Sequence, residues 1–139
     1  MIVANWKANG DIKKNYLWCE TFQNLLDKSS FNYVGISPSH IHFHQLNTFF
    51  KETNVMIGMQ DIYIEGGAIT GSISAEMASA DGCSFCLVGH SERREIFNED
   101  GNLISKKISS LLKNNIKPIL CIGESFEEHK AENTRDKLK

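Results

Sequence analysis

Five short apolar runs, separated by segments with helical periodicity, constrain the fold of this chain more than any other feature. They are rich in β-branched and apolar residues, as buried strands are. The runs cover residues 2–6, 33–37, 55–59, 85–89 and 119–122. Parallel strands need long crossover connections, which are usually helices. The alternation therefore predicts an α/β fold, in which a parallel sheet carries helices on its outside.

The segments between the runs carry helix signals. Asp11 is a suitable N-cap, and the residues after it repeat apolar side chains at spacings of three and four, which predicts a helix with one face on the sheet. This face consists of Ile12, Tyr16, Cys19, Phe22 and Leu26. Ser39 is a suitable N-cap for a helix that reaches Phe50. The remaining connections are predicted as a long loop at 61–74 and helices at 75–82, 104–112 and 126–139.

The composition is that of one globular unit. Of the 139 residues, 41% are hydrophobic and 23% are charged, which is ordinary for a domain with a buried core. The net charge is −2 and the basic residues are scattered, which argues against nucleic acid or a membrane surface as partner. We expect neither a membrane-spanning helix nor a secretory leader. The four cysteines lie in apolar contexts, so we expect a cytoplasmic protein.

Polar side chains follow several of the predicted strands. Because the carboxyl ends of parallel strands meet at one edge of a sheet, these side chains are predicted to lie close together. The set consists of Asn5, Lys7, Ser37, Gln60, His90 and the Gly123-Glu124 pair. A cation, an amide and an imidazole at one place suit an anionic substrate that carries a carbonyl group.

Four strings in this chain closely resemble the triosephosphate isomerase family, in the same order and at about the same spacing. They are Asn5-Trp6-Lys7-Ala8-Asn9-Gly10, Ala68-Ile69-Thr70-Gly71, Gly89-His90-Ser91-Glu92-Arg93-Arg94 and Cys121-Ile122-Gly123-Glu124. The resemblance implies a (β/α)8 TIM barrel, a fold of ~250 residues. Residues 1–139 would form the N-terminal portion of this single domain, a partial barrel truncated after its fifth strand.

The resemblance also implies an activity. Members of the family interconvert dihydroxyacetone phosphate and D-glyceraldehyde 3-phosphate through an enediolate, without a cofactor or a metal. Lys7 is implied as a catalytic and substrate-binding residue and Asn5 as a substrate-binding residue. His90, held neutral as is known for this family, is implied to polarise the carbonyl group and to move protons between the substrate oxygens. Ser91 and Glu92 are implied to support His90, and the family implies a homodimer.

The chain departs from the family pattern in ways that bear on activity. The family's general base is a glutamate after the sixth strand, and no string in residues 125–139 resembles its motif. We therefore expect no general base in this chain, no activity from the chain alone, and a requirement for a complementing C-terminal polypeptide. Ser72 replaces the glutamate that usually forms a loop-to-arginine ion pair, and Asp61 stands where asparagine is common.

Two alternatives compete with an isomerase. One is a non-catalytic barrel fragment that serves as an interaction module. The other is a metal-dependent hydrolase, because His40, His42 and His44 could present three imidazoles on one face of a strand. However, Pro38 and Ser39 mark a helix start, and in a helix only His40 and His44 share a face.

One cysteine pair has the spacing of a redox motif. Cys83 and Cys86 lie at the entry to a predicted strand, whereas redox pairs open a helix. We therefore interpret both as core residues.

Overall fold

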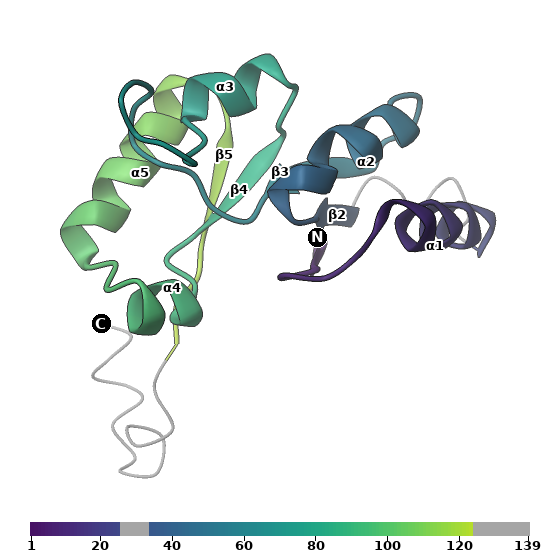
Figure 1. Ribbon diagram of the computed structural model, residues 1–139, viewed down its shortest axis with the longest axis horizontal. Helices are drawn as coiled ribbons and strands as arrows, with labels where there is room; N and C mark the ends of the chain where they lie inside the picture. The colour runs from purple at the N-terminus through teal and green to yellow at the C-terminus, as the bar shows by residue number, and fades with distance from the viewer. Residues whose placement is uncertain (26–33, 124–139) are drawn as a thin grey trace, which may run out of the picture.

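A computed structural model of the chain describes residues 1–25 and 34–123, and its strands form one parallel sheet (Figure 1). The strand order is β1-β2-β3-β4-β5, so each strand pairs with its neighbour in sequence. The strands are β1 (Ile2–Asn5), β2 (Val34–Ser37), β3 (Met56–Met59), β4 (Phe85–Val88) and β5 (Lys117–Leu120). The sheet curls into a half-barrel, which confirms the predicted α/β fold and partial TIM barrel.

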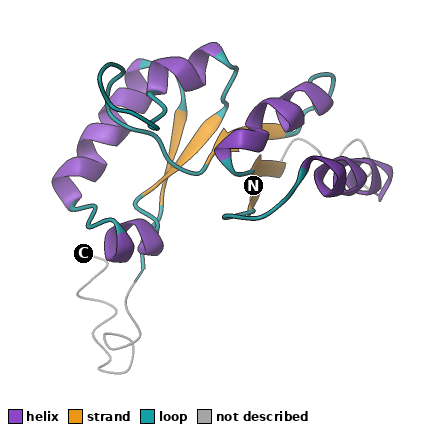
Figure 2. Cartoon of the chain, in the orientation of Figure 1, coloured by secondary structure: helices purple, strands orange, loops and turns teal. Residues whose placement is uncertain are grey.

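The helices occupy the connections between the strands (Figure 2). They are α1 (Ile12–Leu25), the 3-10 turn η2 (His40–His42), α2 (Phe43–Phe49), α3 (Ala75–Ala80), α4 (Ser91–Ile96) and α5 (Gly101–Lys113). Within residues 1–25 and 34–123, no helix is long and apolar enough to cross a lipid bilayer. The helix predicted at 126–139 lies outside the described residues.

The N-cap predictions are right for Asp11 and wrong for Ser39. Asp11 Oδ1 accepts a hydrogen bond from the backbone N–H of Lys14 at 2.9 Å, as an N-cap side chain does. The side chain of Ser39 makes no capping hydrogen bond. Ser39 precedes η2, which lies between it and α2. In this tighter 3-10 turn, the His42 N–H donates a hydrogen bond to the Ser39 carbonyl oxygen at 2.9 Å.

β5 begins earlier than the apolar pattern predicted, and it includes Pro118. The Lys117 N–H donates to the carbonyl oxygen of Ser84, just before β4, at 3.3 Å. The Cys121 N–H donates to that of Val88, the last residue of β4, at 2.8 Å. Alternate backbone groups of a strand face opposite neighbours, so position 118, which has no N–H, faces away from β4. Proline is tolerated in a strand at such a position.

The buried face of α1 differs from the predicted face. Cys19 is buried as predicted, but Ile12 and Tyr16 remain exposed. Asn15 is buried in their place, and its Nδ2 donates to Gln45 Oε1 of α2 at 3.3 Å. A buried amide group needs such a hydrogen-bond partner. The apolar periodicity of the sequence does not show where this partner lies. Leu26 lies outside the described residues.

The two faces of the sheet are filled differently. Apolar side chains of the strands and helices form the main core on the outer face, among them Ile36, Ile57, Val88, Leu46, Phe50, Ile104 and Leu111. On the inner face, the fully buried ring of Phe85 lies over Gly35 and Gly58. A Cβ atom would stand 2.8 Å from this ring at Gly35 and 2.5 Å from it at Gly58. The two glycines therefore make room for Phe85 in the interior of the half-barrel.

The connection between β3 and α3 forms an arm that closes at its base. The Tyr63 N–H donates to the Ile73 carbonyl oxygen at 2.8 Å, and Tyr63 forms an isolated bridge with Ser74. The Ser110 hydroxyl of α5 donates to the Ile64 carbonyl oxygen at 2.5 Å. The predicted long loop is thus tied to α5, while residues 65–72 remain exposed.

Candidate active site

The carboxyl ends of the strands bring most of the predicted polar side chains together. A cavity of about 110 Å³ lies at this edge of the sheet. Its walls are formed by Asn5, Lys7, His40, Gln60, Asp61, His90, Glu92 and Arg93. Ser37 is adjacent, since its carbonyl oxygen accepts a hydrogen bond from Gln60 Nε2 at 3.0 Å. Glu124 lies outside the described residues.

Lys7 is held in a backbone conformation that residues other than glycine rarely adopt. Its φ angle is 53°, in the left-handed region. Its N–H donates to Asn5 Oδ1 at 2.9 Å, and its carbonyl oxygen accepts from Gln60 Nε2 at 2.9 Å. The two neighbouring side chains offset the local strain, and they fix where the lysine side chain leaves the strand end.

The Lys7 side chain reaches across the cavity to Glu92. Its Nζ lies 2.6 Å from Glu92 Oε1, and both side chains are about half exposed. The hydrogen bond from Lys7 holds the pKa of Glu92 below its ordinary value. This ion pair joins the end of β1 to the first turn of α4.

His90 is the N-cap of α4, and its ring is three-quarters buried. Its Nδ1 accepts a hydrogen bond from the Glu92 N–H at 3.3 Å, so a neutral ring would carry its proton on Nε2. Glu92 Oε2 also lies 3.3 Å from Nδ1, a contact that would need a protonated Nδ1. We favour the capping arrangement, because the backbone donor cannot turn away whereas the carboxylate already binds Lys7. The Nε2–H is then the donor available to a ligand.

Sequence reasoning missed His40 as part of this site. It lines the cavity, and desolvation by the surrounding protein lowers the pKa of His40 even though part of the residue reaches solvent. The available signal was its place in the connection that follows β2, three residues after Ser37, where the loops that build the site begin.

The three histidines of the alternative hydrolase interpretation do not converge. His42 is buried, and its Nε2 lies 3.3 Å from the Gly10 carbonyl oxygen. His44 is exposed on α2, and His40 faces the strand-end cavity. Across the described ranges, no three His, Cys, Asp or Glu side chains are grouped as metal ligands would be.

A cluster of four charged side chains begins at the wall of the cavity, and three of them, Asp61, Glu99 and Lys107, are buried. Lys107 Nζ lies 2.6 Å from both Asp61 Oδ1 and Glu99 Oε1. Arg93 Nη2 lies 2.9 Å from Asp61 Oδ2 and 2.7 Å from Glu99 Oε1. Burial raises the pKa of Asp61, against the opposing effect of the two cations. For Glu99 burial acts in the same direction, but hydrogen bonds from Lys107 and Arg93 outweigh it and lower the pKa.

No functional role was assigned to Arg93 or Lys107 from the sequence. Lys107 follows Ile104 by three positions and precedes Leu111 by four, so it shares their buried face of α5. A lysine on the apolar face of a predicted helix was the signal that could have found the cluster. Asp61, at a position where the family commonly has asparagine, supplies one of its two carboxylates.

Cys83 and Cys86 are buried thiols, as predicted. Burial raises the pKa of Cys83 to about 11 and that of Cys86 well above its ordinary value. Both sulfurs are therefore protonated and poorly nucleophilic at neutral pH.

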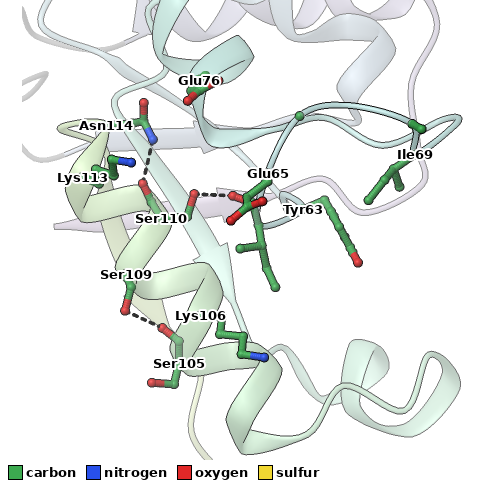
Figure 3. A pocket seen from close by; sticks show the side chains of 13 residues that line it. Tyr63, Glu65, Ile69, Glu76, Ser105, Lys106, Ser109, Ser110, Lys113 and Asn114 are labelled. Carbon is green, nitrogen blue, oxygen red and sulfur yellow. Dashed lines mark hydrogen bonds between the residues drawn. The ribbon is translucent and has the colours of Figure 1, made fainter.

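A larger cavity, of about 780 Å³, lies between α5 and the β3–α3 arm (Figure 3). Charges of both signs line it, from Glu65, Glu76, Lys106 and Lys113, and all four residues are exposed. Size alone would favour this cavity. The smaller strand-end cavity is the better candidate, because it combines a cation, an imidazole and amide groups fixed by hydrogen bonds.

The chain is similar to known proteins along its whole length. The family model described as triosephosphate isomerase matches residues 1–139. The chain belongs to the triosephosphate isomerase family. The triosephosphate isomerase of Aquifex aeolicus is 39% identical over 132 residues, which cover 94% of this chain and 53% of the relative. That of Alkaliphilus oremlandii is 36% identical over 140 residues, covering 100% and 56%. That of Chlamydia muridarum is 35% identical over 144 residues, covering 99% and 52%.

Family membership confirms the resemblance seen in the four strings. The chain spans about half the length of the curated relatives it matches.

Proposed function

We propose that this chain supplies half of the active site of an aldose-ketose isomerase, with residues 1–139 as the N-terminal portion of one barrel domain. The whole protein would interconvert dihydroxyacetone phosphate and D-glyceraldehyde 3-phosphate through an enediolate. The observation that carries this proposal is the meeting of Lys7 and His90 in one cavity, at the carboxyl ends of β1 and β4, in a chain of this family.

The contacts in the cavity support a role for each residue. His90 Nε2–H would donate to the substrate carbonyl oxygen and would pass a proton between the two oxygens of the enediolate. The Lys7 ammonium group would neutralise charge on the phosphate and on the enediolate oxygen. Asn5 would bind substrate as well as the backbone of Lys7.

Glu92 and Ser91 would support Lys7 and His90 without contacting the substrate. The Glu92 carboxylate binds the Lys7 ammonium group, and its backbone N–H donates to His90 Nδ1. An entering anion would therefore compete with Glu92 for Lys7. Ser91 is exposed at the first residue of α4. We assign the general base to no residue of this chain, and neither a cofactor nor a metal to the reaction.

We extend the proposal to the assembly and its surroundings. The exposed β3–α3 arm supports a homodimer as the family implies, with a small-molecule triose phosphate as the substrate. The four free cysteines support a cytoplasmic location.

The test is complementation. Residues 1–139 are expressed alone and together with the C-terminal half of the Aquifex aeolicus relative, and both samples are assayed with D-glyceraldehyde 3-phosphate. We expect no turnover from the chain alone, and turnover from the complemented protein. In that protein His90→Gln should lower kcat by ~10²–10⁴-fold. The matched control His44→Gln changes an exposed histidine on α2 and should leave the rate unchanged.

A folded but inactive complemented protein would contradict the proposal and would favour the non-catalytic interaction module. A His90→Gln variant as active as its parent would also contradict it.

A further inference from the structure

We propose that Asp61 is a positioning residue for His90, acting through Arg93. With Gln60 it forms a two-residue link at the end of β3 that holds the Lys7 and His90 sides of the cavity at a fixed separation. The inference rests on the proposed function, since it concerns how the two catalytic groups are held.

Gln60 holds the Lys7 side of the cavity. Its Nε2 donates to the Lys7 carbonyl oxygen at 2.9 Å and to the Ser37 carbonyl oxygen at 3.0 Å. One amide group thereby ties the carboxyl ends of β1 and β2 to that of β3.

Asp61, the next residue, holds the opposite side. Its Oδ2 lies 2.9 Å from Arg93 Nη2 of α4, and its Oδ1 lies 2.6 Å from Lys107 Nζ of α5. Arg93 is held further by Glu99, which accepts from its Nε and Nη2 at 2.8 and 2.7 Å. The centroid of the Phe97 ring lies 4.2 Å from the guanidinium carbon of Arg93. The guanidinium group therefore has several fixed contacts, and β3 supplies one of them through Asp61.

Arg93 is linked directly to His90. Its N–H donates to the His90 carbonyl oxygen at 2.9 Å, in the first turn of α4. Between them lies Glu92, whose N–H donates to His90 Nδ1 and whose carboxylate binds Lys7. A displacement of Arg93 would thus move both the imidazole and the partner of Lys7.

α4 needs such an anchor because it has little packing of its own. The helix has six residues and none of them is buried. Its fixed contacts are largely polar. They include those from Arg93 to the charged cluster, that of Glu92 with Lys7, and that from Arg94 Nε to the Gly89 carbonyl oxygen at 2.7 Å. Loss of Asp61 removes the ion pair that joins α4 to the end of β3.

Two variants separate the charge of Asp61 from its shape. Asp61→Asn retains an acceptor oxygen and removes the negative charge. The carboxylate of Glu99 is then the one anionic partner that Arg93 and Lys107 share within this cluster. Asp61→Ala removes both. The matched control Glu65→Gln removes a carboxylate from the exposed part of the same β3–α3 connection.

The experiment measures ring ¹⁵N shifts of His90 in histidine-labelled protein, assigned with His90→Gln, over a pH series. It is run on the complemented protein, where kcat and KM are also measured. For Asp61→Ala we expect displaced His90 shifts and a kcat lower by ~10–100-fold with KM within ~3-fold. Asp61→Asn should show smaller changes in the same direction. Glu65→Gln should match the parent.

A purely structural role predicts a different result. An Asp61→Ala protein with a lower unfolding midpoint, but with parental His90 shifts and kcat, overturns the proposal. If Asp61→Ala does not fold, parental shifts and kcat in Asp61→Asn overturn it. If the complemented parent is inactive, the proposed function fails, while the His90 shifts of the variants still decide whether Asp61 positions the ring.

Discussion

At the scale of single residues, the candidate site is built from contacts in which one side chain fixes the backbone or the charge of another. Asn5 and Gln60 hold the backbone of Lys7, and Glu92 binds its ammonium group. The groups of the candidate site are therefore oriented by the protein itself, which is the arrangement that the proposed catalysis would need.

The Lys7–Glu92 pair predicts a pH dependence of stability. Because the pKa of Glu92 is lower in the folded chain than its ordinary value of 4.5, the pair stabilises the fold above that value. This contribution is lost as the pH falls through the lower, folded pKa. Unfolding midpoints of the parent and of Glu92→Gln should therefore differ at pH 7 and converge in acid. The control Glu95→Gln, on the exposed side of α4, should follow the parent, and a difference that persists unchanged in acid would count against the pair.

The buried cluster predicts a large effect at Lys107. Lys107→Met would leave the carboxylates of Asp61 and Glu99 buried with Arg93 as their shared cation. Breaking such a buried pair costs about 3–5 kcal/mol in the free energy of unfolding. Lys106→Met, the neighbouring exposed lysine on α5, should change it by no more than ~0.5 kcal/mol. Denaturant unfolding checks both, and equal stability of the two variants would refute the argument.

At the scale of elements, the sheet is shaped by the inner layer that Phe85 makes with two glycines. The three residues come from the adjacent strands β2, β3 and β4, so the ring determines how closely these strands curl around it. The curl in turn brings the ends of β1 and β4 to one cavity.

Gly58→Ala tests this inner layer. The added Cβ would stand 2.5 Å from the Phe85 ring, and such overpacking costs about 1–3 kcal/mol. Gly101→Ala is the control, because nothing lies within 4 Å of its Cβ position on α5. Thermal and denaturant unfolding should show a loss for the first variant only. Adding Phe85→Leu to Gly58→Ala should recover part of the loss, and a double variant as unstable as the sum of both single variants would contradict the steric explanation.

At the scale of the whole molecule, the half-barrel has two open sides. Among the described residues β1 pairs only with β2, and β5 only with β4. Ile2 and Ile122, at these two sides, are 74% and 73% exposed. Unpaired strand edges and exposed apolar side chains favour association with another chain.

We therefore predict that the 139-residue chain self-associates or unfolds without cooperativity when it is alone. Addition of the C-terminal half of a relative should give a defined species with a cooperative transition. Light scattering after size exclusion, together with denaturant unfolding of each sample, measures both effects. The prediction would be wrong if the chain alone were a monomer that unfolds cooperatively, and if the added C-terminal half changed neither its mass nor its unfolding transition. The open sides would then be stable in water.

The sequence alone determined the order of the elements and the place of Lys7 and His90 at one edge of the sheet. Both depend on local patterns, since apolar runs mark buried strands and a parallel sheet places their carboxyl ends together. The tertiary structure decided which polar groups are buried. Asn15 meets Gln45 across 30 positions, and Lys107 meets Asp61 across 46. A polar side chain is stable in the interior only beside its partner, and such a partner comes from a distant segment that only folding brings near.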